Sequence, residues 1–155
     1  MGQVIGDDGK NYATAAAATS AGHPAVAKIV YVGTTGHATY SHGLALALTD
    51  EANTMNWESA IDACSAKNTS NPVTGATWLL ASKDQWEKMI NAAGGYATLR
   101  DGFSSVGGTN MQQTRYWTST ESTASLAYYV IFTNGDITTS YKTMNTRSVR
   151  ACLAF

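Results

Sequence analysis

The chain has 155 residues, a length that fits one domain with its own buried core. Its 10 Lys and Arg residues are balanced by 11 Asp and Glu residues, so it lacks the basic excess that nucleic-acid binding requires. Charged residues make up only 14% of the chain, so Thr, Ser, Asn, Gly and Tyr must supply its polar surface, as in antibody binding sites. No apolar run approaches the roughly 20 residues of a membrane-spanning helix, so we expect no membrane insertion.

The N-terminal part, residues 1–43, predicts a hairpin, a short helix and one long strand. Its first residues lack the basic start and the apolar stretch of a secretory signal peptide. The sequence Asp-Asp-Gly within residues 2–13 is typical of a hairpin turn, where glycine supplies a positive φ. An alanine-rich stretch predicts a helix over residues 14–21. Valines and an isoleucine predict a buried strand over residues 25–32, and a second apolar strand is predicted over residues 43–48.

A first amphipathic helix is predicted over residues 54–67. Thr54 can cap its first turn, because a threonine hydroxyl accepts hydrogen bonds from free backbone N–H groups there. Trp57, Ile61 and Cys64 recur at helical spacing and share one face. We therefore expect that face to pack against the core.

A short buried strand over residues 78–80 leads into a second predicted helix. That helix begins at Ser82, where Ser-Lys-Asp-Gln forms a capping box, and it ends at Gly94. After this point the sequence predicts no amphipathic helix but only antiparallel strands, with Asn-Gly at 134–135 as a strong hairpin signal. The predicted strands cover residues 116–120, 127–133, 136–141 and 149–155. The order of elements indicates an α+β domain over residues 1–155, with two main helices packed on antiparallel sheets and a C-terminal β meander.

Strand periodicity divides residues 128–133 into two faces. The large apolar side chains of one set are assigned to the core: Tyr128, Val130 and Phe132. The alternate set faces outward: Tyr129, Ile131 and Thr133. Short polar residues mixed with Tyr and Arg follow the turn. Two interpretations stay open from the residues alone, a solvated sheet face or a ligand-contacting surface with tyrosine anchors.

Sequence motifs for metal binding or catalysis are lacking. The three histidines, His23, His37 and His42, have no zinc-ligand spacing, and neither a nucleophile elbow nor a phosphate-binding loop occurs. We therefore predict no metal, no cofactor and no catalytic residue. Cys64 and Cys152 are both expected to be buried. They form either two free core thiols or one bridge, which would close a loop of about ninety residues and add about 4–5 kcal/mol of stability.

Five segments in order resemble the C-type-lectin-like fold, in the bacterial and phage branch related to formylglycine-generating enzymes. They are NWESA at 56–60, WLLAS at 78–82 with Gln85-Trp86, YWTSTE at 116–121, YYVIFTNGDI at 128–137 and VRACLAF at 149–155. The likeness runs from about Leu44 to Phe155. The C-terminal segments also resemble variable proteins of diversity-generating retroelements, in which a fixed scaffold displays residues that are altered by mutation at template adenines.

This resemblance implies a division of the C-terminal region into scaffold and displayed positions, with residues 110–148 as the variable binding region. The implied scaffold positions are Trp117, Tyr128, Val130, Phe132, Gly135, Val149, Cys152 and Phe155. The implied ligand-binding positions are Tyr129, Ile131, Thr133, Asp136, Thr138, Thr139, Ser140, Tyr141, Thr143, Asn145, Thr146, Arg147 and Ser148. Lectin-like domains commonly bridge a first-helix and a last-strand cysteine, which matches Cys64 and Cys152. The sugar- and calcium-binding motifs of true lectins do not occur in the chain.

The leading functional hypothesis is a non-enzymatic binding domain, displayed on a bacterial cell surface or a phage virion. Its partner would be a protein or glycan ligand on a cell surface, bound without a cofactor. Two alternatives remain: a structural pilus or phage-tail module, and an oxidase-like domain that uses Cys152, related to formylglycine-generating enzymes.

Overall fold

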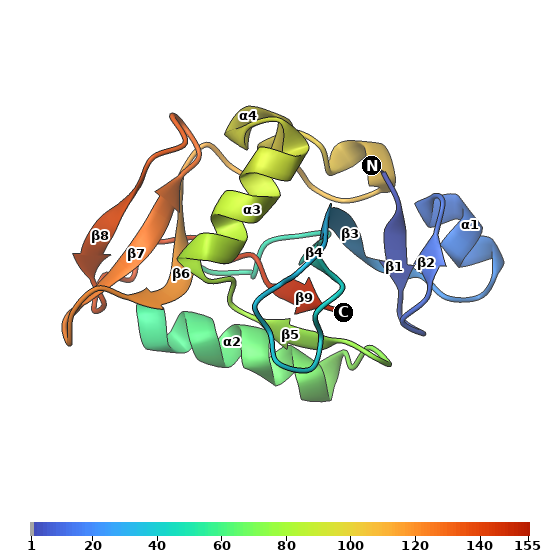
Figure 1. The fold of residues 1–155 in the computed structure, drawn as a ribbon, viewed down its shortest axis with the longest axis horizontal. Helices are drawn as coiled ribbons and strands as arrows, with labels where there is room; N and C mark the ends of the chain where they lie inside the picture. The colour runs from blue at the N-terminus through green and yellow to red at the C-terminus, as the bar shows by residue number, and fades with distance from the viewer. Residues whose placement is uncertain (1) are drawn as a thin grey trace.

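The computed structural model describes residues 2–155, and its first elements agree with the sequence prediction. Strands β1 (Val4–Gly6) and β2 (Asn11–Tyr12) form a hairpin. Helix α1 (Ala15–Ser20) follows, and the Thr14 hydroxyl caps it by accepting the Ala17 N–H. These elements lie at one end of the molecule (Figure 1).

A six-stranded antiparallel sheet forms the central layer, in the order β2-β1-β3-β4-β9-β5. Its longest strand is β3 (Ala25–Val32), with the predicted bounds, and it pairs with the fully buried β4 (Gly43–Ala47). The last strand, β9 (Cys152–Ala154), inserts between β4 and β5 (Thr77–Leu79). The C-terminal residues therefore complete the core of the sheet.

Two helices cover opposite faces of this sheet (Figure 1). Helix α2 (Trp57–Ser70) buries Trp57, Ala60 and Cys64 on one face, and α3 (Lys83–Ala93) buries Trp86 and Met89 on the other. The α2 cap is Asn56, whose side chain accepts the Ser59 N–H, and not Thr54 as predicted. The predicted capping box of α3 is present, with both of its hydrogen bonds. None of the described helices is long and apolar enough to cross a bilayer.

Two short helices follow α3, where the sequence had predicted none. The left-handed Gly94 ends α3, and α4 (Tyr96–Arg100) begins at once and buries Leu99. A 3-10 turn, Ser104–Val106, comes next. Both are shorter than two full α-helical turns, so they carry no periodic pattern for sequence reasoning to detect.

The C-terminal meander forms a separate three-stranded sheet at the other end of the molecule (Figure 1). Its strands are β6 (Arg115–Glu121), β7 (Leu126–Ile131) and β8 (Ile137–Tyr141), paired in that order. Gly135 adopts a positive φ of 86° in the turn between β7 and β8, as the Asn-Gly signal predicts.

Polar side chains join this sheet to the body of the molecule. The indole N–H of Trp57 donates to the Thr118 carbonyl at 2.7 Å, and that of Trp117 donates to the Met55 carbonyl at 2.9 Å. The fully buried Arg150 donates to Asp50 at 2.6 Å, beside further bonds to two backbone carbonyls. The two indole donors thus fix the sheet against α2 and its preceding loop, whereas Arg150 joins the segment before β9 to the residues around Asp50 and Thr109.

The two cysteines do not form the bridge that the lectin-like resemblance implies; they are the two free core thiols of the other alternative. Both are free and buried, and they belong to different sides of the central sheet. Cys64 and Leu153 belong to the core beneath α2, whereas the side chain of Cys152 points to the α3 side of the sheet. Because neighbouring residues of a strand point to opposite faces, the sheet itself separates the two sulfurs.

The α+β class predicted from the sequence is confirmed, with antiparallel sheets and helices around them. The C-type-lectin-like assignment stays a prediction.

Candidate functional site

Strands β6 and β7 of the three-stranded sheet are covered on both faces, which changes the predicted orientation of one key residue. Val130 and Phe132 are fully buried toward α3, as expected. Tyr128 is only half-buried, whereas Tyr129, assigned outward, is just 8% exposed. The segment that leads to β9 lies over the face of Tyr129, so its ring packs edge-on against Trp117, with their centroids 6.3 Å apart.

Arg147 lies on top of these two rings. Its guanidinium carbon is 4.6 Å from the ring centroid of Tyr129 and 5.9 Å from that of Trp117. The terminal nitrogens donate to the hydroxyls of Ser140 and Thr146, each at 3.1 Å. The buried Nε has no hydrogen-bond partner. We name this group the arginine shelf: Arg115, Trp117, Tyr129, Ser140 and Arg147.

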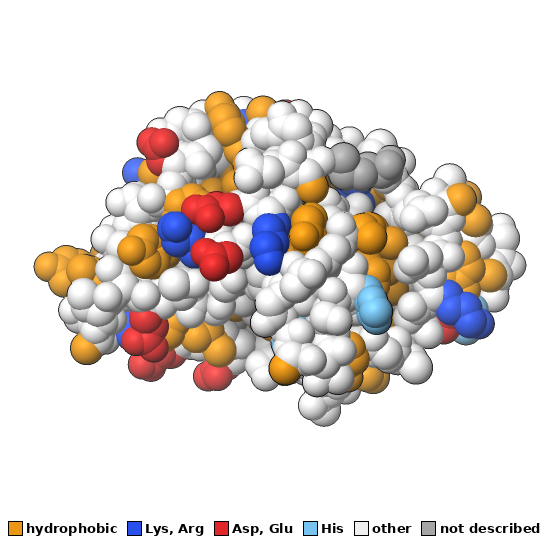
Figure 2. Space-filling model, in the orientation of Figure 1, with side chains coloured by type: hydrophobic (Ala, Val, Ile, Leu, Met, Phe, Trp, Pro, Cys, Tyr) orange, Lys and Arg blue, Asp and Glu red, His pale blue; other side chains and the backbone are white. Residues whose placement is uncertain are grey.

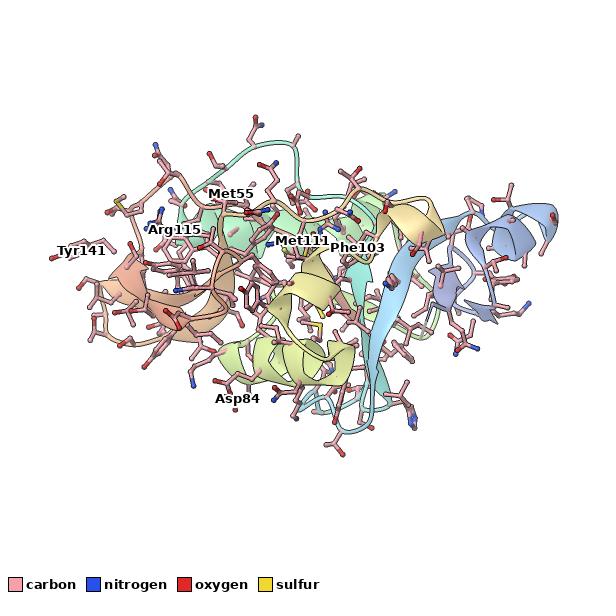
Figure 3. The ribbon with its side chains drawn as sticks, turned by 90° about the horizontal axis from the view of Figure 1, so that it is seen from above. Met55, Asp84, Phe103, Met111, Arg115 and Tyr141 are labelled. Carbon is pink, nitrogen blue, oxygen red and sulfur yellow. The ribbon has the colours of Figure 1, made fainter. Side chains whose placement is uncertain are left out.

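Arg115 adds a second guanidinium to the shelf. It pairs across the sheet with Ile131 and stands two residues before Trp117, so it shares the face of Trp117 and Tyr129. Its side chain is exposed, and in Figure 3 it lies at the same end of the molecule as Tyr141. The shelf therefore presents two like charges on one face.

The shelf holds positive charge without a negative partner. Among the described residues, no carboxylate oxygen lies within 4.0 Å of the side chain of Arg115 or Arg147. Burial lowers the pKa of the Arg147 guanidinium, and the nearby charge of Arg115 lowers it further. An arginine side chain stays protonated in proteins, so Arg147 cannot avoid the free-energy cost of a buried charge by losing its proton.

Arg150 shows how this chain stabilises a buried arginine that serves the fold. It makes an ion pair with Asp50 at 2.6 Å and donates to the carbonyls of Ala47 and Thr109. Its guanidinium also lies 4.5 Å from the ring centroid of Phe103. Arg147 has the aromatic support but neither the carboxylate nor the carbonyls.

The predicted ligand-binding positions fall into three groups. Seven are exposed: Thr133, Asp136, Thr138, Tyr141, Thr143, Asn145 and Thr146. Three are half-buried: Ile131, Thr139 and Ser140. Three are buried, contrary to the prediction that they are freely displayed: Tyr129, Arg147 and Ser148. Arg147 and Ser148 belong to the segment that crosses this face before β9; Arg147 lies over Tyr129, and Ser148 is hydrogen-bonded to the backbone of β6. Periodicity within a single strand carries no information about such a crossing segment.

Tyr141 is the most prominent exposed side chain of this region. It is 64% exposed and projects from the far end of the three-stranded sheet, away from the body of the molecule (Figure 3). It alternates with Ser140 along β8 and so points to the face opposite the arginine shelf. The exposed positions therefore form two surfaces of one sheet rather than one flat patch.

A concave site away from the shelf was missed by sequence reasoning. A cleft of about 540 Å³ lies between α2, the start of α3 and the loop around His37, and it includes Ser65, Asp84 and Lys88. Figure 2 shows that charged side chains on this face gather over α3, whereas most of the visible surface is uncharged. The lining comes from several separate segments, so no local motif could have indicated the cleft.

The N-terminal hairpin contains the only three-residue cluster of metal-ligand type within residues 2–155: Asp7, Asp8 and His23. His23 Nδ1 lies 2.9 Å from Asp7, and Asp8 accepts the Tyr12 hydroxyl at 3.0 Å. Asp8 also pairs with Lys10 at 3.3 Å. The two contacts of Asp8 lie within the hairpin, and the contact of Asp7 joins the turn to His23, which follows α1. Partners within the protein therefore account for all three side chains.

Comparison with known proteins supports a fold but no family. No family model matches the chain, and no curated protein sequence matches it. A solved structure, a fimbrial protein from Bacteroides ovatus, is similar with a TM-score of 0.63 at 16% identity. The similarity covers 99% of this chain and 48% of that protein, so the chain spans about half the length of its structural neighbour. The fold is therefore one that also occurs in a fimbrial protein.

Proposed function

We propose that this protein is a non-enzymatic binding module of a bacterial surface appendage of the fimbrial kind. The observation that carries the proposal is the shared fold, which extends over 99% of the chain. The module would contact its partner through the three-stranded sheet, where seven of the predicted positions are exposed. No bond is made or broken in this role, and both cysteines are buried away from any substrate.

The composition supports the same role. The outer sheet exposes short hydroxyl and amide side chains beside a tyrosine, the mixture that allows adaptable hydrogen bonding around rigid anchors. A pilus module and a receptor-binding module both require such a surface, and they differ in whether the partner is a neighbouring subunit or an external ligand.

Surface labelling of intact cells tests the proposal. We expect a membrane-impermeant biotin reagent to modify this protein on the encoding bacterium, and immunogold electron microscopy to find it on filaments. Labelling that appears only after lysis, or a uniform cytoplasmic gold signal, would overturn the proposal. A cytoplasmic protein detected in the same samples controls for cell breakage.

A second candidate is that the displayed surface is diversified by a retroelement. Ten of the thirteen predicted positions are exposed or half-buried, which is compatible with exchange of their side chains. Sequences of this gene from one population should then differ mainly at those ten positions, and Tyr129, Arg147 and Ser148 should stay constant. Substitutions scattered over the whole chain would exclude diversification.

A further inference from the structure

The arginine shelf is built differently from the structural arginines of the same protein. Arg150 and Arg100 each pair with an aspartate and donate to a backbone carbonyl. Arg147 is 8% exposed, donates to side-chain hydroxyls but to no carboxylate or carbonyl, and leaves its buried Nε unpaired. Removing a charge from water without a counter-charge lowers stability, and the contacts with the rings of Tyr129 and Trp117 offset part of that cost.

We propose that the arginine shelf binds a carboxylate group of an acidic polysaccharide. This inference rests on the proposed binding function and names its ligand class. A guanidinium is planar and matches a carboxylate with two parallel hydrogen bonds, which the exposed Arg115 can supply. Arg147 adds a second positive charge on the same face. The rings of Trp117 and Tyr129 hold Arg147 in place, so little side-chain entropy is lost when the ligand arrives.

The surroundings favour a polysaccharide over a protein partner. Protein interfaces depend on large exposed anchor side chains that become buried in the complex, chiefly Trp, Tyr and Arg. In the shelf the rings of Trp117 and Tyr129 are already buried within the protein, so of these anchor types only Arg115 is exposed. The side chains on and beside the shelf are mostly short and hydroxylated, such as Thr138, Ser140 and Thr146, and these donate to and accept from sugar hydroxyls. The most exposed aromatic side chain nearby, Tyr141, belongs to the opposite face of β8.

Binding to polygalacturonate tests the inference directly. We expect the purified protein to bind polygalacturonate at low salt, and to bind its methyl-esterified form or neutral dextran at least about tenfold more weakly, because esterification removes the charge that the guanidinium recognises. Arg115→Gln should reduce the affinity for polygalacturonate by about tenfold. Lys10→Gln, which removes one positive charge from the distant hairpin, is the matched control and should bind like the wild type.

Arg147→Met separates binding from folding. We expect this variant to lose polygalacturonate binding and to keep or raise the melting temperature, because an unpaired buried charge is replaced by an apolar side chain of similar length. If Arg147→Met does not fold, the affinities of Arg115→Gln and Lys10→Gln for polygalacturonate test the inference without it.

Several results would overturn the inference. No binding to polygalacturonate, equal binding to its methyl ester, or equal losses in Arg115→Gln and Lys10→Gln would each exclude a specific carboxylate site. Poly-L-glutamate that binds as tightly as polygalacturonate, or more tightly, would assign the carboxylate to a protein partner. The binding assays do not depend on whether the protein is found on filaments. A wrong ligand class is therefore distinguishable from a wrong proposed function.

Discussion

Individual side chains in this protein show that burial has different consequences for arginine, tyrosine and cysteine. The hydroxyl of Tyr116 donates to Asp50 at 2.7 Å, and burial together with that bond raises its pKa. Arg150 uses the other oxygen of the same carboxylate. Buried polar groups at this junction are thus paired, in contrast to Arg147 on the shelf.

The two thiols give a prediction at the scale of single residues. Burial raises the pKa of Cys64 from 9.0 to about 12, and it raises the pKa of Cys152 as well. The unfolded chain therefore releases thiol protons above about pH 9 while the folded protein keeps them, and stability is lost as the pH rises from 9 toward 12. The expected slope is on the order of 1 kcal/mol per pH unit for each thiol.

Urea unfolding at pH 8, 9 and 10 measures this loss, and Cys64→Ala should make the fall shallower. A thiol-reactive disulfide reagent should label the native protein slowly and both cysteines rapidly in urea. Rapid labelling of Cys152 in the native state would contradict its burial and would support the oxidase-like alternative instead.

At the scale of elements, sequence signals with a local cause were the most accurate. The capping box at Ser82 and the left-handed Gly94 bound α3 as predicted, and β3 has the predicted limits. Thr54 failed as a cap because Asn56, two residues later, accepts the Ser59 N–H and starts α2. Two polar residues near a helix start compete for one role, and the path of the preceding loop decides between them.

The turn between β7 and β8 gives a prediction at this scale. Gly135 has a φ of 86°, and an added Cβ would lie 2.6 Å from the ring of Tyr96. Gly94 has a similar φ of 84° but open space around it. We expect Gly94→Ala to cost about 1 kcal/mol from backbone strain, and Gly135→Ala to cost about twice as much because the tyrosine must also move.

Denaturant unfolding of both variants checks this difference. The Tyr96 hydroxyl donates to the Thr133 carbonyl at 3.2 Å, and displacement of the ring would disturb that bond. Equal losses of stability in the two variants would mean that Tyr96 moves aside freely and that this contact contributes nothing to the turn.

At the scale of the whole molecule, the C-terminal strand β9 contributes side chains to the cores on both sides of the central sheet. Strand β9 lies between β4 and β5, and its residues alternate between the α2 side and the α3 side of the central sheet. The segment just before it carries Arg147 across the outer sheet and Arg150 into the junction with Asp50. The same C-terminal segment therefore contributes Arg147 to the shelf and β9 to the central sheet, and its bridge between Ser148 and Tyr116 joins it to the outer sheet.

The sequence by itself determined the α+β class and most helix and strand positions, because caps, turns and periodicity act over a few neighbouring residues. Only the tertiary structure decided that Tyr129 and Arg147 are buried together and that Cys64 and Cys152 lie on opposite sides of a sheet. These outcomes depend on which distant segment crosses which face. Such a crossing is set by packing of the whole core, and the pattern within a single strand does not encode it.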